Sequence, residues 1–188
     1  MNQRELQREE TKKRIYECAF ELFMEKDFSD VKVQDIAKKA GVSVGSVYYH
    51  YRSKEEIIDY GYFAFDQQLK EFYESSAPQS GINGIHALLS YQIDTCIKRT
   101  SRVIAITFKN QINSENSYLY SKDRYLYRLL VENLEAAGVR RKTPEEAANM
   151  LLCATRGCVY DWCCHQGAYD LHEMAARELE PFYEYLGI

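Results

Sequence analysis

Hydrophobic residues recur with the spacing of an α-helix along almost the whole chain, and no β-hairpin signal interrupts them. In residues 11–26, for example, Ile15, Ala19, Leu22 and Phe23 fall at helical spacing with charged residues between them. The same period predicts further helices over residues 54–73, 82–98, 102–112, 117–137 and 144–164, and from 171 onward. With two short helices before residue 54, we expect an all-α fold of about nine helices.

Several of these helix boundaries carry sequence signals. Residues 143–146, Thr-Pro-Glu-Glu, are typical of a helix start, with threonine as the N-cap and glutamate three positions later. Pro181 is expected to end or kink the last helix, because proline lacks the N–H that the helix requires. The segment 75–81, SSAPQSG, is the clearest break in the helical pattern.

Residues 33–54, VQDIAKKAGVSVGSVYYHYRSK, have the spacing of a helix-turn-helix. Ala37 supplies the small residue that two steeply crossing helices need where they touch, and Gly41 tolerates the positive φ of the turn. Ser43 is placed to cap the second helix. The residues left facing outward, where they can enter a DNA major groove, are Ser43, Val44, Gly45, Ser46, Tyr48, Tyr49 and His50.

The segment 35–57, DIAKKAGVSVGSVYYHYRSKEEI, resembles the DNA-binding domain of the TetR family of bacterial transcriptional regulators, and the amphipathic helix before it also fits that family. The resemblance implies an N-terminal three-helix DNA-binding domain in residues 1–54 and a C-terminal helical ligand-binding and dimerisation domain in residues 55–188. It further implies a regulator, most simply a repressor, that binds a palindromic operator as a homodimer and is released by a small organic effector. The alternative interpretation of the motif is an ordinary αα-hairpin.

The same resemblance assigns roles to individual residues. Tyr48 and Lys54 would hold the phosphate backbone, and Lys54 also falls at a helix N-terminus, which favours phosphate. Gly45 would let the helix approach closely, whereas His50 would pack between helices or contact a phosphate. Family members usually have threonine at the position of Lys32, which cannot cap a helix but can contact a phosphate as a point charge. The candidates for base edges are Ser43, Val44, Ser46 and Tyr49.

The overall charge of −4 argues at first against nucleic-acid binding. The local balance reverses that argument, because residues 32–54 contain five basic residues and one acidic residue, a balance of +4. A basic segment on an acidic protein favours specific docking over indiscriminate adhesion to DNA.

The effector pocket and the dimer surface are predicted with less sequence support. Sixteen tyrosines are many for 188 residues, and a pocket lined by rings and hydroxyls suits a planar or amphipathic organic ligand. The predicted lining residues are Phe65, Tyr91, Thr95, Phe108, Tyr125, Met150 and Trp162. Apolar stripes on the last two helices predict the dimer interface, although they would also fit an intramolecular core. These stripes are Leu151, Leu152, Thr155, Cys158 and Val159, followed by Leu171, Ala175, Leu179 and Phe182.

Other function classes find little support in the sequence. No glycine-rich phosphate loop, HExxH or GxSxG motif occurs, so we expect neither an enzyme nor a cofactor. The charged N-terminus and the lack of a long apolar run favour a cytoplasmic protein that does not bind membranes. The alternative to an organic effector is metal or redox sensing through Cys163, Cys164 and His165. Adjacent helical residues point about 100° apart, however, so the two cysteines do not easily share one metal.

Overall fold

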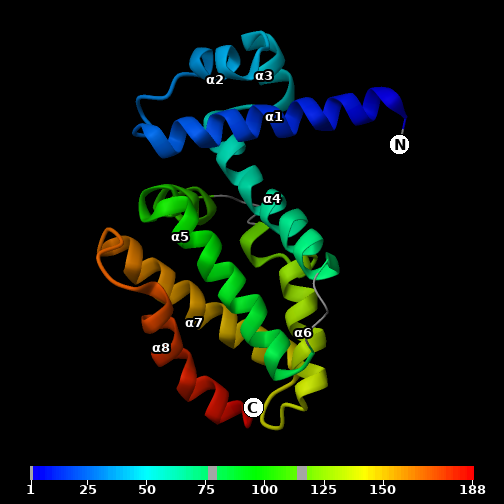
Figure 1. The fold of residues 1–188 in the computed structure, drawn as a ribbon, viewed down its shortest axis with the longest axis vertical. Coiled ribbons are helices and arrows are strands. Elements are labelled where there is room, and N and C mark those ends of the chain that lie inside the picture. Colours follow the sequence, from blue (N-terminus) through cyan, green and yellow to red (C-terminus); the bar gives the residue numbers. More distant parts are fainter. Residues whose placement is uncertain (1, 76–79, 114–117) are drawn as a thin grey trace. The chain divides into compact units, whose positions relative to one another are not determined.

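The computed structural model describes residues 2–75, 80–113 and 118–188, and within those ranges it contains eight α-helices, one 3₁₀ turn and no strand (Figure 1). The all-α prediction is therefore confirmed. Contacts divide the chain into two units, residues 1–63 and 64–188, and the division falls inside helix α4 (Lys54–Ser75). No helix in the described ranges has the length and apolarity needed to cross a membrane.

The first unit contains α1 (Gln3–Glu25), α2 (Val33–Ala40), α3 (Val44–His50) and the beginning of α4. Helix α1 begins earlier than the hydrophobic pattern predicts, because Asn2 and Glu5 form a reciprocal cap. The Glu5 N–H donates to the Asn2 side chain at 2.9 Å, and the Asn2 N–H donates to the Glu5 carboxylate at 2.8 Å. This Asn-x-x-Glu signal was present in the sequence.

The core of the first unit joins α1 to the helix-turn-helix. The apolar face predicted for α1 is buried, as are Ile36 and Val47 from α2 and α3. Tyr51, immediately after α3, is 2% exposed and its hydroxyl donates to the Lys12 carbonyl at 3.0 Å. Burial raises the pKa of this phenol, so it remains a protonated donor. The end of α3 is thereby fixed to α1.

The second unit continues with α5 (Ile82–Ile112), the turn η1 (Tyr118–Tyr120), α6 (Tyr125–Ala137), α7 (Pro144–Cys164) and α8 (Leu171–Leu186). Helix α5 covers both helices predicted over 82–112, and Thr100, with φ 64° and ψ 151°, breaks it close to the predicted gap. Helix α6 is shorter than predicted, because residues 121–124 form a turn in which the Asp123 N–H donates to Ser121 Oγ at 3.1 Å.

The predicted start of α7 is present, whereas the last helix does not end at Pro181, which was one of the two effects expected of that proline. Thr143 Oγ1 accepts from the Glu146 N–H at 3.2 Å, and the Glu146 carboxylate accepts from the Thr143 N–H at 3.1 Å. Pro181 lies inside α8, which continues to Leu186. Tyr183 and Leu186 are buried in the core, so tertiary packing holds the last turn despite the missing N–H.

The predicted dimer stripes form the core of the second unit instead of an outer surface. Helix α7 packs against α5, α6 and α8, so its apolar face is enclosed within one chain. Phe182 is half-buried and packs against the same core. The residues predicted for the interface that are instead 0–7% exposed in the single chain are Leu151, Leu152, Thr155, Cys158, Val159, Leu171, Ala175 and Leu179. These side chains are therefore enclosed within one chain, which leaves them little surface for a partner.

Candidate nucleic-acid interface

The turn between α2 and α3 has the geometry that the sequence predicts. Gly41 adopts φ 67° and ψ 35°, the left-handed conformation that glycine tolerates best. Ser43 Oγ accepts from the Ser46 N–H at 3.1 Å and so caps α3. Val47 is 1% exposed and anchors the helix, whereas Tyr48 and Tyr49 are 53% and 69% exposed. Helix α3 therefore buries one side and presents two aromatic rings outward.

None of the nine predicted DNA contacts is buried, and seven of them belong to α3 or its cap. Gly45 is exposed, and a Cβ atom added there would meet only Ser43 Oγ at 3.8 Å. Ser43 Oγ already accepts a main-chain hydrogen bond, so Ser43 stabilises the start of α3 whether or not it also contacts a base. The outer surface of α3 comprises Ser43, Val44, Gly45, Ser46, Tyr48, Tyr49 and His50.

Lys54 has a different environment from the one expected. Its Nζ donates to the Phe28 carbonyl at 2.6 Å and to the Val31 carbonyl at 2.7 Å, and it lies 4.6 Å from the centre of the Phe28 ring. These contacts hold the loop between α1 and α2 against the start of α4. The sequence predicts that Lys54 holds the phosphate backbone, whereas in the structure its ammonium is engaged by these two main-chain carbonyls.

The start of α2 has half of a capping box. The Asp35 carboxylate accepts from the Lys32 N–H at 3.2 Å, but the Lys32 side chain has no acceptor with which to return the bond. Lys32 is exposed, so its ammonium is available to a phosphate. As the sequence predicts, the Lys32 side chain does not cap α2.

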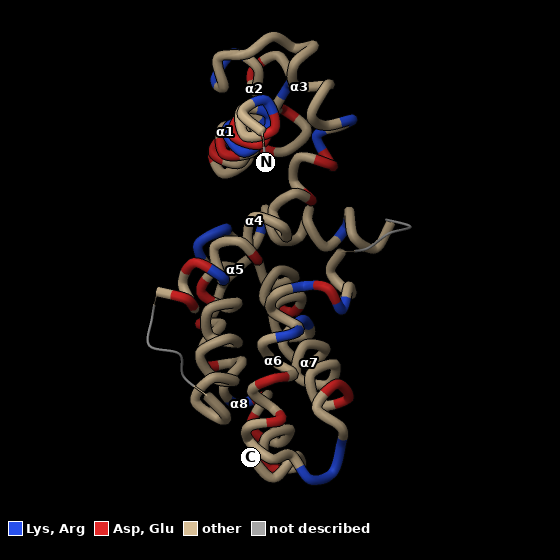
Figure 2. The backbone as a smooth tube through the Cα atoms, turned by 90° about the vertical axis from the view of Figure 1, so that its right-hand side faces the viewer, with Lys and Arg blue, Asp and Glu red and all other residues tan. Residues whose placement is uncertain are grey.

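The basic residues of segment 32–54 divide into two groups. Lys39 pairs with Glu21 at 2.9 Å and Glu25 at 3.6 Å, both on α1, and Lys54 is engaged by carbonyls. Lys32, Lys38 and Arg52 are exposed and make no ion pair within the described residues. Lys and Arg positions occur along the stretch that contains α2, α3 and the start of α4 (Figure 2). Within segment 32–54, these three side chains are therefore available to contact DNA phosphates.

Sequence reasoning missed Arg8, which lies on the part of α1 that the hydrophobic pattern did not predict. Its guanidinium lies 5.6 Å from the centre of the Tyr49 ring, and the Tyr49 and His50 rings are 5.1 Å apart. Burial lowers the pKa of His50, and Arg8 and Lys12 lower it further, so the imidazole is neutral at pH 7. An additional cation therefore adjoins the exposed end of α3.

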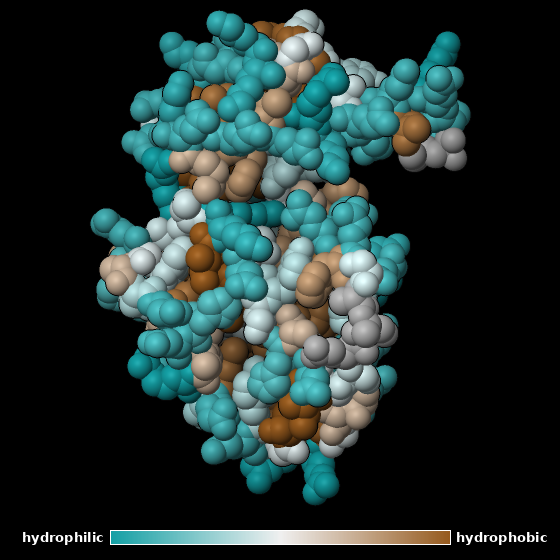
Figure 3. Space-filling view, in the orientation of Figure 1, coloured by the Kyte–Doolittle hydropathy of each residue, from teal (hydrophilic) through white to brown (hydrophobic). Residues whose placement is uncertain are grey.

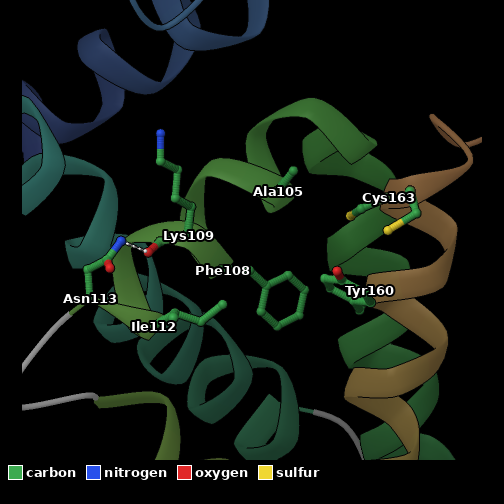
Figure 4. Close-up of a pocket in the computed structure, with 8 residues that line it drawn as sticks. Ala105, Phe108, Lys109, Ile112, Asn113, Tyr160 and Cys163 are labelled. Atoms are coloured by element: carbon green, nitrogen blue, oxygen red, sulfur yellow. Dashed lines mark hydrogen bonds between the residues drawn. The ribbon is translucent and has the colours of Figure 1, made fainter.

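The second unit contains an apolar pocket of about 330 Å³ between the C-terminal half of α5 and the end of α7. In Figure 4, Phe108 and Ile112 approach it from α5 and Tyr160 and Cys163 from α7. Ile112 is 74% exposed and Tyr160 58% exposed, so apolar surface reaches solvent here, as it does elsewhere on residues 64–188 (Figure 3). The pocket suits an apolar group of a small organic ligand.

Of the seven residues predicted to line an effector pocket, only Phe108 lines this one. Phe65 and Trp162 are 5% and 6% exposed in the core, and Trp162 Nε1 donates to the Tyr169 carbonyl at 3.1 Å. Aromatic residues that were predicted to line a pocket thus belong to the core. The sequence could not distinguish the two, because a helix has the same apolar pattern whether it faces a core or a cavity. The others, which are half-buried and do not line this pocket, are Tyr91, Thr95, Tyr125 and Met150.

The cysteine and histidine residues near the end of α7 do not gather into a metal site. Among the described residues, no three His, Cys, Asp or Glu side chains are close enough to hold a metal ion. His165 Nδ1 lies 3.2 Å from the Asp161 carboxylate. Burial raises the pKa of Cys163 to about 11 and that of Cys96 to about 12, which makes both thiols poor nucleophiles.

Comparison with known proteins points to one family. The family model described as "Bacterial regulatory proteins, tetR family" matches residues 15–60, which contain the helix-turn-helix. The chain is 44% identical over 50 residues to the HTH-type transcriptional regulator SrpR of Pseudomonas putida. That match covers 27% of this chain and about a quarter (24%) of the length of SrpR.

Solved structures extend the similarity to the whole fold. A TetR transcriptional regulator from Rhodococcus sp. RHA1 superposes with a TM-score of 0.68 at 18% identity, over 98% of this chain and 99% of that one. The transcriptional regulator FadR from Bacillus subtilis, in complex with stearoyl-CoA, gives a TM-score of 0.61 at 20% identity, over 90% and 96% of the two chains. At these identities the similarity establishes a shared fold.

Proposed function

Because the chain belongs to the TetR family of bacterial regulatory proteins, we propose that it binds a palindromic DNA operator as a homodimer and leaves it when a small organic effector binds. The observation that carries this proposal is the outer surface of α3. Val47 anchors this helix in the core, the two tyrosines at 48 and 49 are exposed, and Gly45 has no side chain. Exposed lysine and arginine residues precede and follow the helix in the sequence. If the protein binds its operator and an effector releases it, the simplest regulatory outcome is repression of transcription.

The proposed division of work follows the chemistry of each side chain. The Tyr48 hydroxyl and the ammonium groups of Lys32 and Lys38 contact phosphates, which fixes the register of the protein on DNA. Base edges are read by the N-terminal turn of α3, where Val44 offers apolar contact to a thymine methyl group. Gly45 allows this turn to approach the groove closely.

The test is a selection of random duplex DNA by the purified protein, beside the variant Gly45→Glu. A side chain at this position meets no clash, and glutamate in the first turn of a helix is electrostatically favourable, so the variant should remain folded. Facing phosphates, the same carboxylate should weaken binding by about 100-fold or more. We expect wild-type protein to enrich a palindrome and the variant to lose it.

A matched control separates this local effect from a change in net charge. Gln68→Glu adds the same charge at an exposed position of α4 and should retain the wild-type enrichment. If Gly45→Glu also selected the palindrome with wild-type affinity, α3 would not lie in the groove and the proposed mode of binding would be wrong.

The proposed homodimer requires a surface other than the buried stripes. Along α7 the exposed positions Asn149, Cys153, Gly157, Tyr160 and Cys164 recur every three or four residues and carry no charge. Small residues at Cys153 and Gly157 permit close approach of a second helix. We propose that this outward face of α7, here called the α7 outer stripe, packs against its copy in the partner subunit.

Gly157→Arg is expected to convert the dimer to a monomer. Among the described residues nothing lies within 4 Å of a Cβ atom added at Gly157, so arginine should fit the isolated chain and clash with a partner packed on this face. Sedimentation or light scattering should show the mass falling to that of one chain, 22.0 kDa. Gly157→Ala should keep the wild-type mass, and an unchanged mass for Gly157→Arg would place the dimer interface elsewhere.

Effector control is proposed to act through α4, which contributes Lys54 to the first unit and Asp66 to the second. The apolar pocket of the second unit and the acyl-CoA bound to the structurally similar FadR support a ligand with an apolar portion. To release DNA, such a ligand must bind the operator-competent and released states with different free energies.

A further inference from the structure

A second, smaller pocket in residues 64–188 has a different chemical character from the apolar one. It has a volume of about 100 Å³ and lies between η1, α6 and α7. Three leucines line it, and its other lining residues are Tyr120, Ser121, Arg124, Tyr127, Asn149 and Arg156. This volume holds a group of a few heavy atoms but no long ligand.

The charge of this pocket is positive. Among the described residues, two arginines line it and no carboxylate does. Arg124 is paired with Asp66, since its Nη2 lies 3.1 Å from Asp66 Oδ1. Arg156 lies 5.0 Å from the centre of the Tyr120 ring and makes no ion pair within the described residues. Within the part of the chain that the structure describes, the Arg156 charge therefore has no acidic partner.

Side chains that carry hydroxyl groups, among them Ser121 and Tyr127, line the same pocket. The Tyr127 side chain is 8% exposed, and its buried hydroxyl has no hydrogen-bond partner among the residues that the structure describes. A buried polar atom of this kind normally has a partner, which indicates that an absent ligand or a water molecule supplies one. Ser121 Oγ accepts from the Asp123 N–H at 3.1 Å, so the serine proton is left to donate.

We propose that this pocket binds a compact oxyanion, the carboxylate or phosphoryl head group of a small effector. Arg156 forms the charged hydrogen bonds to the anion, because a guanidinium matches the two oxygens of an oxyanion with parallel N–H groups. The Tyr127 hydroxyl donates a further hydrogen bond, and Arg124 contributes its charge. The apolar pocket is a separate site with a different lining.

The location of Arg124 gives this anion a route to α4. Arg124 lines the pocket and pairs with Asp66 of α4, and Asp66 also accepts from the Tyr118 hydroxyl at 3.0 Å. An anion at the pocket competes electrostatically with Asp66 for Arg124. An effect of this anion on DNA binding rests on the proposed function, whereas anion binding itself does not.

The test is thermal unfolding of the full chain in sodium propionate, sodium benzoate or sodium phosphate, with sodium chloride at matched ionic strength as the reference. Trp162 is the single tryptophan and is buried in the second unit, so its fluorescence reports unfolding of that unit. At ten times the dissociation constant, a bound anion should raise Tm by about 3–6 °C. The carboxylates and phosphate distinguish the two head groups.

Two variants locate the site and one controls for charge. Arg156→Gln should weaken anion binding about 10–100-fold, and Tyr127→Phe about 2–10-fold. Without anion, Tyr127→Phe should keep or raise the wild-type Tm, since the deleted hydroxyl has no partner among the described residues. Arg128→Gln removes an exposed charge of α6 outside the pocket and should behave like wild type.

The outcomes are independent of DNA binding, so failure of the proposed function would leave them unchanged. A Tm rise with either head group that is lost in Arg156→Gln supports the site and identifies the head group. No rise with any of the three anions would overturn it, and so would a wild-type shift retained by both pocket variants. A lower Tm of Tyr127→Phe without anion would also contradict it, because the hydroxyl would then have a structural partner.

Discussion

Replacing Asp66 with leucine is expected to destabilise the second unit by about 3–5 kcal/mol, the usual cost of leaving a buried charge without its partner. Asp66 is 3% exposed, and the Arg124 side chain that it pairs with is 7% exposed. The Asp66 carboxylate also accepts from the Tyr118 hydroxyl and the Tyr125 N–H, both at 3.0 Å. One substitution therefore removes three hydrogen bonds and the ion pair of a buried guanidinium.

The Tyr118 contact stays intact over the ordinary pH range. Burial, and then the neighbouring Asp66, raise the pKa of Tyr118 to about 12, so the phenol remains a protonated donor. The connection between α4 and the start of α6 thus depends on the carboxylate of Asp66. Loss of that connection explains why the expected cost exceeds that of a surface ion pair.

Urea unfolding followed by Trp162 fluorescence measures the expected loss. Removing both charges in the double variant Asp66→Leu/Arg124→Met should recover most of it, because an apolar pair leaves no buried charge uncompensated. Glu71→Leu, at an exposed position of the same helix, should change stability by less than about 0.5 kcal/mol. A loss below about 1 kcal/mol for Asp66→Leu would mean that Arg124 reaches solvent or another partner.

The second large effect is expected for Lys54→Met, which should destabilise the first unit by about 3 kcal/mol. The variant removes two charged hydrogen bonds, to the Phe28 and Val31 carbonyls, and each such bond contributes roughly 1.5–3 kcal/mol. Methionine keeps the length of the side chain but offers no donor, so the two carbonyls lose their partner. Circular dichroism during heating should show an earlier transition.

Lys38→Met is the matched control, since Lys38 is exposed and makes no ion pair within the described residues. It should leave stability within about 0.5 kcal/mol while reducing the salt dependence of DNA binding by about one phosphate contact. The opposite pattern for Lys54→Met, unchanged stability with a reduced salt slope, would restore its sequence-predicted role at a phosphate.

The helices and the helix-turn-helix followed from the sequence alone because their signals are local. Helical period, the cap at Thr143 and the left-handed turn at Gly41 each involve residues within four positions of one another. The same locality explains why Ser43 was correctly predicted to cap α3. Family resemblance then added the expected role of α3, which the geometry of an exposed, well-anchored helix supports.

The partners of side chains were decided only by the tertiary structure, because they join residues far apart in the chain. Lys54 meets a carbonyl 23 positions away, and Asp66 meets Arg124 at a separation of 58. An apolar stripe has the same pattern whether it faces a core or a second subunit, so the enclosure of α7 by three helices could not be deduced from it. The sequence thus determined which segments are helical, and folding determined which side of each helix remains available for binding.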